Sequence, residues 1–190
     1  MKFISTEIPG LVIVEPHRFE DARGYFVETF NQRIFNEHVG YVDFVQDNES
    51  MSIHGVLRGL HLQQGDHSQA KLVRVVDGSV FDVVVDLRPE SPTFGRWFGT
   101  ELSGQNARML FVPRHFAHGF LVTSEKARFV YKVDNYYCPD AELTIAYNDP
   151  HLDISWPELK QPYILSQRDL TRSVSWQQFL ARCADAQNKK

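Results

Sequence analysis

Two stretches of the chain gather polar side chains of the kinds that transfer protons or stabilise negative charge. The first, QDNESMSIHGVLRGLHLQQGDHSQAK over 46–71, supplies Gln46, Asn48, Arg58, His61 and Lys71, and the second, VPRHFAHGFLV over 112–122, holds His115 and His118. Imidazole is the commonest general base in enzymes, and cations beside it suit an anionic substrate or a developing oxyanion. His61 is therefore a candidate base flanked by Arg58 and Lys71, while a structural histidine with solvated cationic side chains remains the alternative.

The 8 histidines of the chain also raise the question of a metal site. A jelly-roll metal site of the cupin type uses a His-x-His pair, a following Glu and a later His. Gly55 and His61 have the spacing that opens such a motif, but Gln63 stands in place of the second His and His67 in place of Glu. His118 follows Pro113 by the spacing of the second motif, although His115 stands where that motif has Gly. Two imidazoles are too few for a closed site with three protein ligands, so no metal is expected, with His67 or His115 left open as improvised ligands.

Length and composition exclude several classes of protein. A chain of 190 residues is expected to form one domain over 1–190, with its core at about 8–170. A net charge of -4 argues against a nucleic-acid partner. No apolar run is long enough to span a membrane, and MKFISTEIPG at the start lacks the apolar stretch of a signal peptide, so a cytoplasmic location is expected. Cys138 and Cys183 have no CxxC spacing and are expected to be ordinary thiols.

Short apolar runs punctuated by Gly, Pro, Asn and Asp predict a protein made of strands. The runs 71–76 and 79–87 flank Asp77-Gly78, the strongest two-residue signal for a hairpin. In the second run an apolar face alternates with a mixed face, which carries Asp82 and Asp86 and can line a pocket. Further strands are expected over 11–15, 25–30, 43–48, 56–62, 108–112, 119–123, 127–133 and 142–147. So many short strands predict an all-β fold, a closed barrel or jelly roll.

Only two short helices are expected, both at the periphery. Asn31 can cap the first, which carries Ile34, Phe35 and His38. The second covers about 174–186, where apolar side chains recur at helical spacing, and we interpret it as a packing helix.

Six motifs together resemble one known family. They are RGLH at 58–61, KLVR at 71–74, FVQDN at 44–48, FAHGF at 116–120, FVYK at 129–132 and LSQRD at 165–169. The chain is similar, from about Ile8 to Asp169, to the dTDP-4-dehydrorhamnose 3,5-epimerase family. The resemblance implies a cupin-like jelly roll that uses no metal or other cofactor, acts on a dTDP-sugar and forms a homodimer.

The activity implied by this resemblance is an isomerisation through an enolate. A family member epimerises carbons 3 and 5 of dTDP-4-dehydro-6-deoxy-D-glucose to give dTDP-4-dehydro-L-rhamnose, in dTDP-rhamnose biosynthesis. By similarity His61 is the base, Lys71 stabilises the enolate at the 4-oxygen and Tyr131 is the acid. A neutral phenol stays protonated near pH 7 and can donate its proton when the enolate collapses. Asp169 is expected to orient His61 and stabilise its imidazolium.

The resemblance also implies a set of substrate-binding residues. They carry over as Arg23, Phe26, Glu28, Gln46, Asn48, Arg58, His118, Tyr137, Glu142 and Arg168. Arg23 and Arg168 suit the pyrophosphate because a guanidinium matches it with fork geometry. Phe26 or Tyr137 is expected to stack on thymine, with core packing as the alternative for either ring. Glu28 and Glu142 are expected to accept hydrogen bonds from the sugar or the base.

Three positions depart from the family pattern. Arg168 stands where the family more often has Lys, His115 replaces a usual Gly, and Leu62 replaces a common aromatic. His115 requires either a backbone without strongly positive φ or mild strain. These departures leave open an epimerase that acts on carbon 3 alone of a related dTDP-4-keto-6-deoxy sugar, or one that accepts another 4-keto nucleotide sugar. A non-catalytic sugar-binding jelly roll and a metal-dependent cupin oxygenase also stay open.

Overall fold

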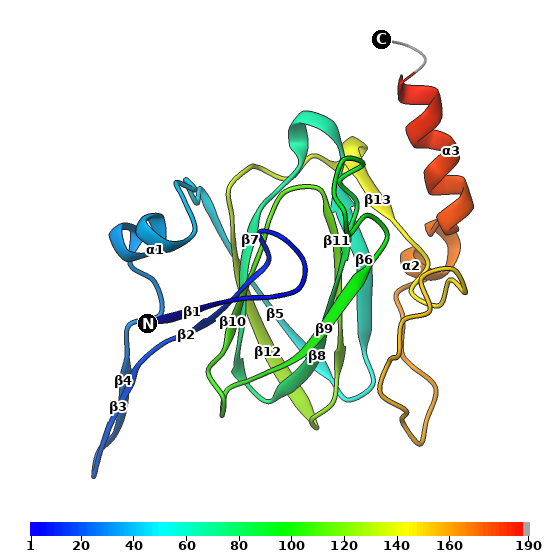
Figure 1. The fold of residues 1–190 in the computed structure, drawn as a ribbon. Coiled ribbons are helices and arrows are strands. Elements are labelled where there is room, and N and C mark those ends of the chain that lie inside the picture. The colour runs from blue at the N-terminus through cyan, green and yellow to red at the C-terminus, as the bar shows by residue number, and fades with distance from the viewer. Residues whose placement is uncertain (188–190) are drawn as a thin grey trace.

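Two antiparallel β-sheets pack face to face in the computed structural model, which describes residues 1–187 (Figure 1). Positions 188–190 of the expected 1–190 domain lie outside the described residues. The six-stranded sheet has the order β1 (Lys2–Ser5), β2 (Val12–Glu15), β10 (Met109–Val112), β7 (Lys71–Asp77), β12 (Lys126–Val133) and β5 (Gln46–Ile53). The five-stranded sheet has the order β13 (Glu142–Thr144), β6 (Leu57–Gln63), β11 (Phe116–Val122), β8 (Ser79–Asp86) and β9 (Trp97–Ser103). The predicted all-β class is confirmed.

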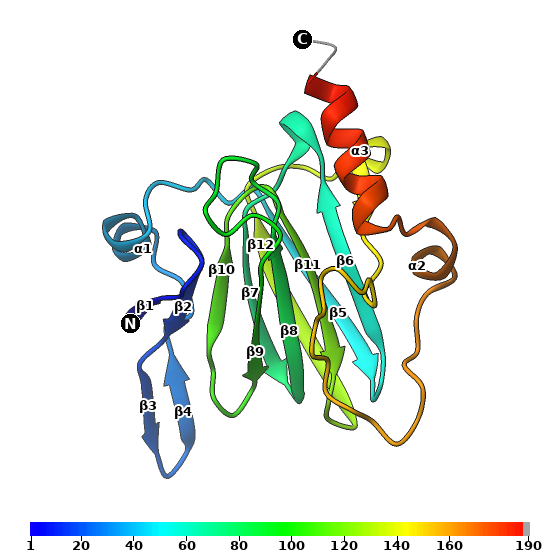
Figure 2. The same cartoon turned by 45° about the vertical axis from the view of Figure 1, so that its right-hand side comes forward.

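The remaining elements lie outside the sandwich. A separate two-stranded ribbon pairs β3 (Arg18–Asp21) with β4 (Gly24–Val27). The helices are α1 (Gln32–His38), α2 (Gln167–Arg172) and α3 (Trp176–Gln187), with short 3-10 turns at Gly65–His67 and Pro139–Ala141. Figures 1 and 2 both place the β3–β4 ribbon and α1 on one side of the sandwich and α2 and α3 on the other. No helix within residues 1–187 is long and apolar enough to cross a membrane.

The hairpin predicted at Asp77-Gly78 is wrong, because β7 and β8 belong to different sheets. Strand β7 pairs with β10 and β12, and β8 pairs with β11 and β9, so neither has a free edge for the other. Gly78 has a φ of 80°, and a Cβ there would collide with the Lys126 carbonyl. Asp77 and Gly78 instead form the corner at which the chain passes from β7 in one sheet to β8 in the other. Such a corner, like a hairpin turn, needs a residue with positive φ that allows close approach of the backbone.

Other sequence expectations differ from the structure at the edges of the fold. The strand expected over 43–48 begins three residues later as β5, and β1, β3, β9 and α2 were not predicted. Helix α1 is confirmed, with Asn31 Oδ1 accepting the Ile34 N–H at 3.3 Å. His115 adopts a φ of 66°, so it takes the left-handed conformation of the usual glycine. Strands β1 and β9 lie at sheet edges, where few contacts constrain the residue types.

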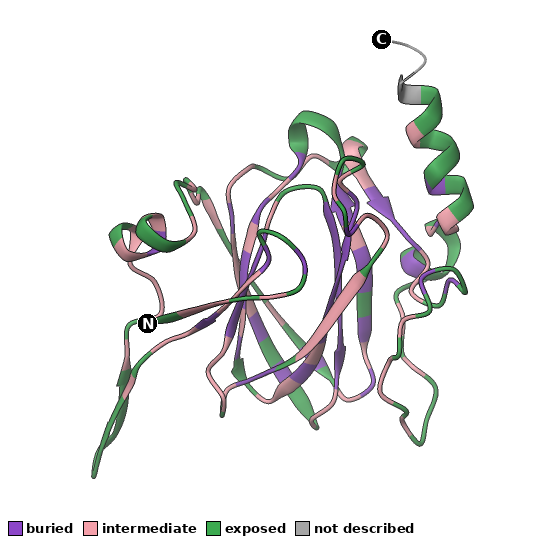
Figure 3. Cartoon of the chain, viewed as in Figure 1, coloured by how far each residue is buried: buried purple, intermediate pink, exposed green. Residues whose placement is uncertain are grey.

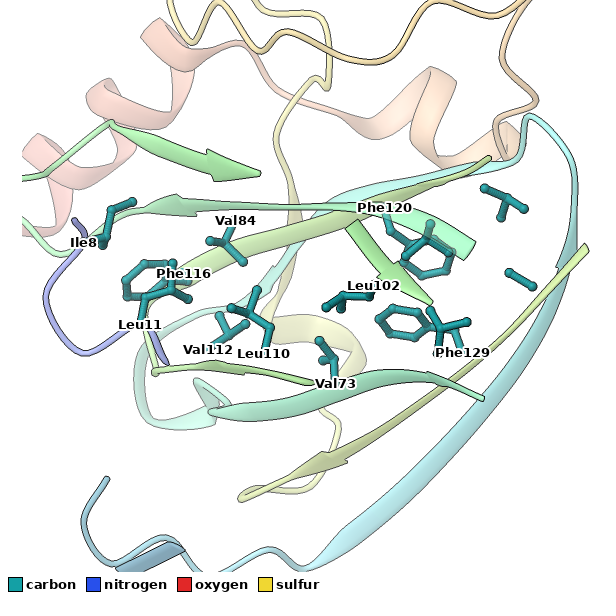
Figure 4. Packing of buried hydrophobic residues seen from close by; sticks show 14 residues of the cluster. Ile8, Leu11, Val73, Val84, Leu102, Leu110, Val112, Phe116, Phe120 and Phe129 are labelled. Carbon is teal, nitrogen blue, oxygen red and sulfur yellow. The ribbon is translucent and has the colours of Figure 1, made fainter. Parts of the chain in front are cut away.

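The main core fills the space between the two sheets, as Figure 4 shows. Val73 and Leu110 come from the six-stranded sheet and Val84 and Phe120 from the five-stranded sheet, and all are buried. Figure 3 shows buried segments, coloured purple, along the strands of the sandwich. Val84 shares the inner face of β8 with Asp82 and Asp86, because side chains alternate along a strand. The mixed face predicted for this strand therefore points between the sheets.

Asp86 is the anchor of a buried polar network at one end of β8. Its carboxylate accepts hydrogen bonds from Arg88 Nη2 at 2.7 Å, Ser91 Oγ at 2.6 Å and Thr93 Oγ1 at 2.7 Å. Burial opposes ionisation, but these hydrogen bonds outweigh it and lower the pKa of Asp86 to about 2. A carboxylate held ionised in this way stabilises the folded state at neutral pH by about 2 kcal/mol.

We predict that Asp86→Asn lowers the free energy of unfolding by an amount that depends on pH. The pKa of Asp86 is lower in the folded state than in the unfolded state, so its contribution is complete above the unfolded pKa and is lost as the pH falls toward 2. Urea unfolding of both proteins at about pH 7 and about pH 3 should show the difference between them shrinking at the lower pH. A difference that is the same at both pH values would contradict this account.

Candidate active site

A cavity of about 250 Å³ lies between the two sheets where the apolar core ends. Phe120 and Phe129 stack with ring centroids 4.2 Å apart and belong both to the core and to the cavity wall. The residues around the cavity are Asn48, Glu49, Ser50, Arg58, His61, Lys71, His118, Gly119, Phe120, Phe129 and Tyr131. Side chains expected at the site from β5, β6, β7, β11 and β12 therefore meet in one space.

A bulge in β6 turns Arg58 and His61 toward the same cavity. These positions are three apart and would face opposite sides of a regular strand. His61 pairs with His118, and Arg58 pairs with Phe120, so three steps on β6 match two on β11. An extra residue in one strand reverses the side to which the following side chains point. Gly59 permits the bulge, because a Cβ there would lie 3.0 Å from the His118 carbonyl oxygen and closer still to the Gly119 backbone.

His61 and Asp169 meet although 108 positions separate them. His61 Nε2 lies 2.6 Å from Asp169 Oδ1, and the imidazole is 32% exposed while the carboxylate is 4% exposed. Ser166 caps α2, accepting the Asp169 N–H at 3.0 Å and donating its hydroxyl to Asp169 Oδ2 at 2.9 Å. Burial raises the pKa of Asp169, but the hydrogen bonds from His61 and Ser166 outweigh it and keep the pKa below its usual range. The ionised Asp169 carboxylate therefore accepts the Nε2–H of His61, so Nδ1 is the acceptor nitrogen of the neutral imidazole.

Lys71 and Tyr131 reach the cavity from the opposite sheet. Burial lowers the pKa of the Lys71 ammonium to about 8, and the negative charges of Asp82 and Glu142 offset only part of that effect. Burial also raises the pKa of the Tyr131 hydroxyl, Arg58 opposes the shift, and Glu142 adds to it. Near pH 7 the cavity thus holds an ammonium that can stabilise an oxyanion and a neutral phenol that can donate a proton.

Neighbouring polar side chains on β5 hold two of the expected binding residues. Arg58 Nε donates to Ser52 Oγ at 3.0 Å, and Gln46 Nε2 donates to Asn48 Oδ1 at 2.8 Å. Asn48 lines the cavity. Gln46 lies on the same face of β5 but does not line the cavity. Gln46 therefore contacts the expected site through Asn48.

Glu142, Arg168 and Tyr137 come together at the mouth of the site. Arg168 Nη2 lies 2.5 Å from Glu142 Oε2, and the Tyr137 hydroxyl donates to the same carboxylate. A cleft of about 330 Å³ is lined by Glu142 and Arg168 and shares Arg58 and His61 with the inner cavity. The cleft extends from His61 to a guanidinium, so a ligand with a reactive ring and an anionic tail can lie along it.

Three expected residues do not join this site within one chain. Arg23 and Phe26 lie on the β3–β4 ribbon, and Glu28 follows it. Arg23 is ion-paired with Asp21 at 2.6 Å, and Figures 1 and 2 place the ribbon across the sandwich from α2. Their role in binding stays a prediction.

The residues at the positions of the incomplete cupin metal motif have other contacts. Gln63 Oε1 accepts the Cys138 N–H at 2.9 Å, and His118 Nε2 lies 2.9 Å from Asp82 Oδ2. Within residues 1–187 no three His, Cys, Asp or Glu side chains are grouped as a metal site requires.

Two residues of the site were missed from the sequence. Ser166 stands three positions before Asp169, a spacing typical of a capping box, so the start of α2 was readable there. Asp82 was noted only as part of a mixed strand face, although an acidic residue inside a β-branched run is itself a signal of a buried polar partner.

Comparisons with known proteins show the family of the chain. The family model described as dTDP-4-dehydrorhamnose 3,5-epimerase matches residues 5–175. A dTDP-4-dehydrorhamnose 3,5-epimerase from Shigella flexneri is 52% identical over 171 residues, which cover 90% of this chain and 93% of that protein.

Solved structures give the same result. The dTDP-4-dehydrorhamnose 3,5-epimerase of Elizabethkingia anophelis NUHP1 has a TM-score of 0.89 at 48% identity, covering 94% of this chain and 97% of that one. The dTDP-6-deoxy-D-glucose-3,5-epimerase of Legionella pneumophila Philadelphia 1, in complex with dTDP-4-keto-L-rhamnose, has a TM-score of 0.87 at 48% identity, covering 91% and 92%. The expected cupin-like jelly roll is confirmed, and the chain belongs to the dTDP-4-dehydrorhamnose 3,5-epimerase family.

Proposed function

We propose that the protein is an epimerase that converts dTDP-4-dehydro-6-deoxy-D-glucose into dTDP-4-dehydro-L-rhamnose by inverting carbons 3 and 5. The observation that carries this proposal is the contact at 2.6 Å between His61 on the five-stranded sheet and Asp169 of α2, opposite Lys71 and Tyr131 on the six-stranded sheet. Inversion at a carbon beside a ketone needs a base on one face and an acid on the other. The two sheets supply these groups from opposite walls of one cavity.

Proton removal is assigned to His61. A carboxylate only accepts hydrogen bonds, so the neutral ring donates Nε2–H to Asp169 and carries its free lone pair on Nδ1. Nδ1 takes the proton from carbon 3 or 5, the C–H electron pair forms the enolate, and the carbonyl electrons move to the 4-oxygen. Asp169 stabilises the imidazolium that results.

Completion of the reaction is assigned to Lys71 and Tyr131. The Lys71 ammonium balances the enolate oxygen in a site from which bulk water is largely displaced. Tyr131 gives its proton to the carbon from the face opposite His61 as the carbonyl re-forms, and the proton held by His61 returns to the tyrosinate through solvent. Substrate and product have the same composition, so no oxidant or reductant is required.

Two competing functions are less well supported. A sugar-binding jelly roll needs no base paired with a buried carboxylate and no acid on the facing wall. An epimerase restricted to carbon 3 shares His61, Lys71 and Tyr131, but the relatives at 48% to 52% identity carry names with both carbons.

We propose that the protein acts as a cytoplasmic homodimer in which the β3–β4 ribbon of each copy reaches the partner's site. Phe19, Tyr25 and Phe26 expose 59%, 57% and 68% of their surface on this projecting ribbon. Exposed aromatic clusters mark interaction surfaces, and a two-fold dimer places the same ribbon at both sites. Arg23 and Phe26 would then bind the pyrophosphate and thymine from the second copy.

We predict that His61→Ala lowers turnover of dTDP-4-dehydro-6-deoxy-D-glucose by about 10²- to 10⁴-fold, because the base is lost. Product formation is followed by NMR of the sugar protons. His67→Ala is the matched control, since His67 is exposed and lies outside the cavity, and it should keep wild-type turnover. Wild-type turnover by His61→Ala would refute the assigned role.

We predict that Tyr131→Phe separates proton exchange from inversion. His61 remains able to remove and return a proton on its own face, whereas the acid of the opposite face is missing. In deuterium oxide the variant should therefore introduce deuterium beside the ketone while the original configuration is retained, as read by NMR. Inversion at the wild-type rate would show that another group is the acid.

We predict that two inactive variants restore activity when they share a dimer. Arg23→Ala and His61→Ala each damage a different part of every site, but a mixed dimer contains one site with neither change. Random pairing after co-expression should recover about one quarter of the wild-type sites. Mixed dimers without recovered activity would show that the ribbon does not complete the partner's site, and a monomer in gel filtration would refute the dimer.

A further inference from the structure

A second histidine–aspartate pair lies beside the proposed catalytic pair. His61 and His118 are direct partners in the register of β6 and β11, and each imidazole binds a carboxylate through Nε2. The two pairs differ in burial, since the His118 side chain is 8% exposed and its partner Asp82 is fully buried. The mechanism proposed above uses the first pair and gives Asp82 no role.

The hydrogen bonds of Asp82 determine which nitrogen of His118 carries the proton. Asp82 Oδ2 and Oδ1 lie 2.9 Å and 3.1 Å from His118 Nε2. A carboxylate accepts hydrogen bonds and does not donate them, so Nε2 carries a proton, and in the neutral ring the acceptor nitrogen is Nδ1. Nδ1 makes no hydrogen bond in the part of the chain that the structure describes, and His118 lines the cavity. Nδ1 is therefore available as an acceptor for a substrate hydroxyl.

Asp82 also acts on Lys71, which lies on the facing sheet. Burial works against the Lys71 ammonium, and the negative charge of Asp82 is the largest influence that opposes it, followed by that of Glu142. Glu142 is already neutralised by Arg168 at 2.5 Å. Asp82 has no Lys or Arg within ion-pair distance among residues 1–187, and its full burial prevents screening by water.

The other charged and titratable groups around the cavity come from every strand that borders it. They are Glu49 of β5, Arg58 and His61 of β6, His118 of β11 and Tyr131 of β12, with Glu142 of β13 and Arg168 and Asp169 of α2 in the adjoining cleft. Arg58 is the fixed cation of this set and does not favour a second cation beside it. The charged form of Lys71 is therefore favoured by the carboxylates of Asp82 and Glu142.

Building on the proposed epimerase reaction, we propose that Asp82 is a positioning residue that keeps Lys71 an ammonium and His118 in the Nε2–H tautomer. It touches neither the base nor the reacting carbons and acts through these two side chains. The Asp82 carboxylate thus keeps Lys71 charged on one wall of the cavity, where it stabilises the enolate. On the other wall it keeps Nδ1 of His118 available as a hydrogen-bond acceptor.

The test is the pH dependence of kcat/KM for Asp82→Asn. Asparagine keeps the shape of aspartate but not its charge, so Lys71 should lose its proton at lower pH than in the wild type. We expect the alkaline limb of the wild-type profile near pH 8, set by Lys71, and in Asp82→Asn this limb should move down by about one pH unit. The loss of activity should accordingly be greater above pH 8 than near pH 6.5, by about tenfold.

Asp86→Asn is the matched control, because Asp86 is a buried aspartate on the same face of β8 but belongs to the Arg88 network outside the cavity. It should leave the alkaline limb in place. A uniform loss of activity at every pH in Asp82→Asn, or an equal shift in Asp86→Asn, would mean that Asp82 is only structural.

Nitrogen-15 NMR of the wild-type protein can determine which nitrogen of His118 carries the proton. This measurement tests the proposal even where a variant does not fold or shows no turnover. The proposal requires His118 to be protonated on Nε2 and not on Nδ1, and an Nδ1–H tautomer would overturn it. Titration of Lys71 Nζ in wild type and Asp82→Asn reports the charge effect without substrate. A wild-type protein inactive on the dTDP-sugar would refute the proposed function, whereas an unshifted Lys71 titration would refute only the role of Asp82.

Discussion

A half-buried ammonium is the constraint on which the rest of the site depends. Removing a charged amine from water is costly unless other groups compensate, and Lys71 begins a central strand of the six-stranded sheet with its amine between the two sheets. Its pKa near 8 shows that burial is only partly offset by Asp82 and Glu142. An ammonium that is both charged and poorly solvated interacts strongly with an enolate oxygen, because little water competes for it.

The sandwich itself supplies the geometry that inversion needs. Groups on two facing sheets lie on opposite sides of any flat ring held between them, which is the arrangement that removal and return of a proton from opposite faces requires. The bulge at Gly59 then brings Arg58 and His61 to the same wall, and the register of β6 and β11 sets His118 beside His61. The paired strands thus fix the positions of these side chains relative to one another.

Local patterns in the sequence predicted the strands and the polar clusters, but not how distant parts meet. Alternation revealed β8 and its acidic inner face, and Asn31 revealed α1. The Asp77-Gly78 signal failed because glycine permits several tight bends, and only the pairing of whole strands decides between a hairpin and a corner. The contact of His61 with Asp169 depends on the path of the chain after β13, which no local pattern encodes. The resemblance to a known family pointed to His61 and Asp169, and the fold brings these two residues into contact.

The central claim is that one cavity removes and returns protons at both carbons beside a ketone. The most direct measurement is incubation of the wild-type protein with dTDP-4-dehydro-6-deoxy-D-glucose in deuterium oxide, with NMR and mass spectrometry of the sugar. The account predicts deuterium at carbons 3 and 5 with inversion at both, even where little product accumulates. Deuterium at carbon 3 alone would restrict the enzyme to a single epimerisation, and no deuterium at either carbon would contradict the account.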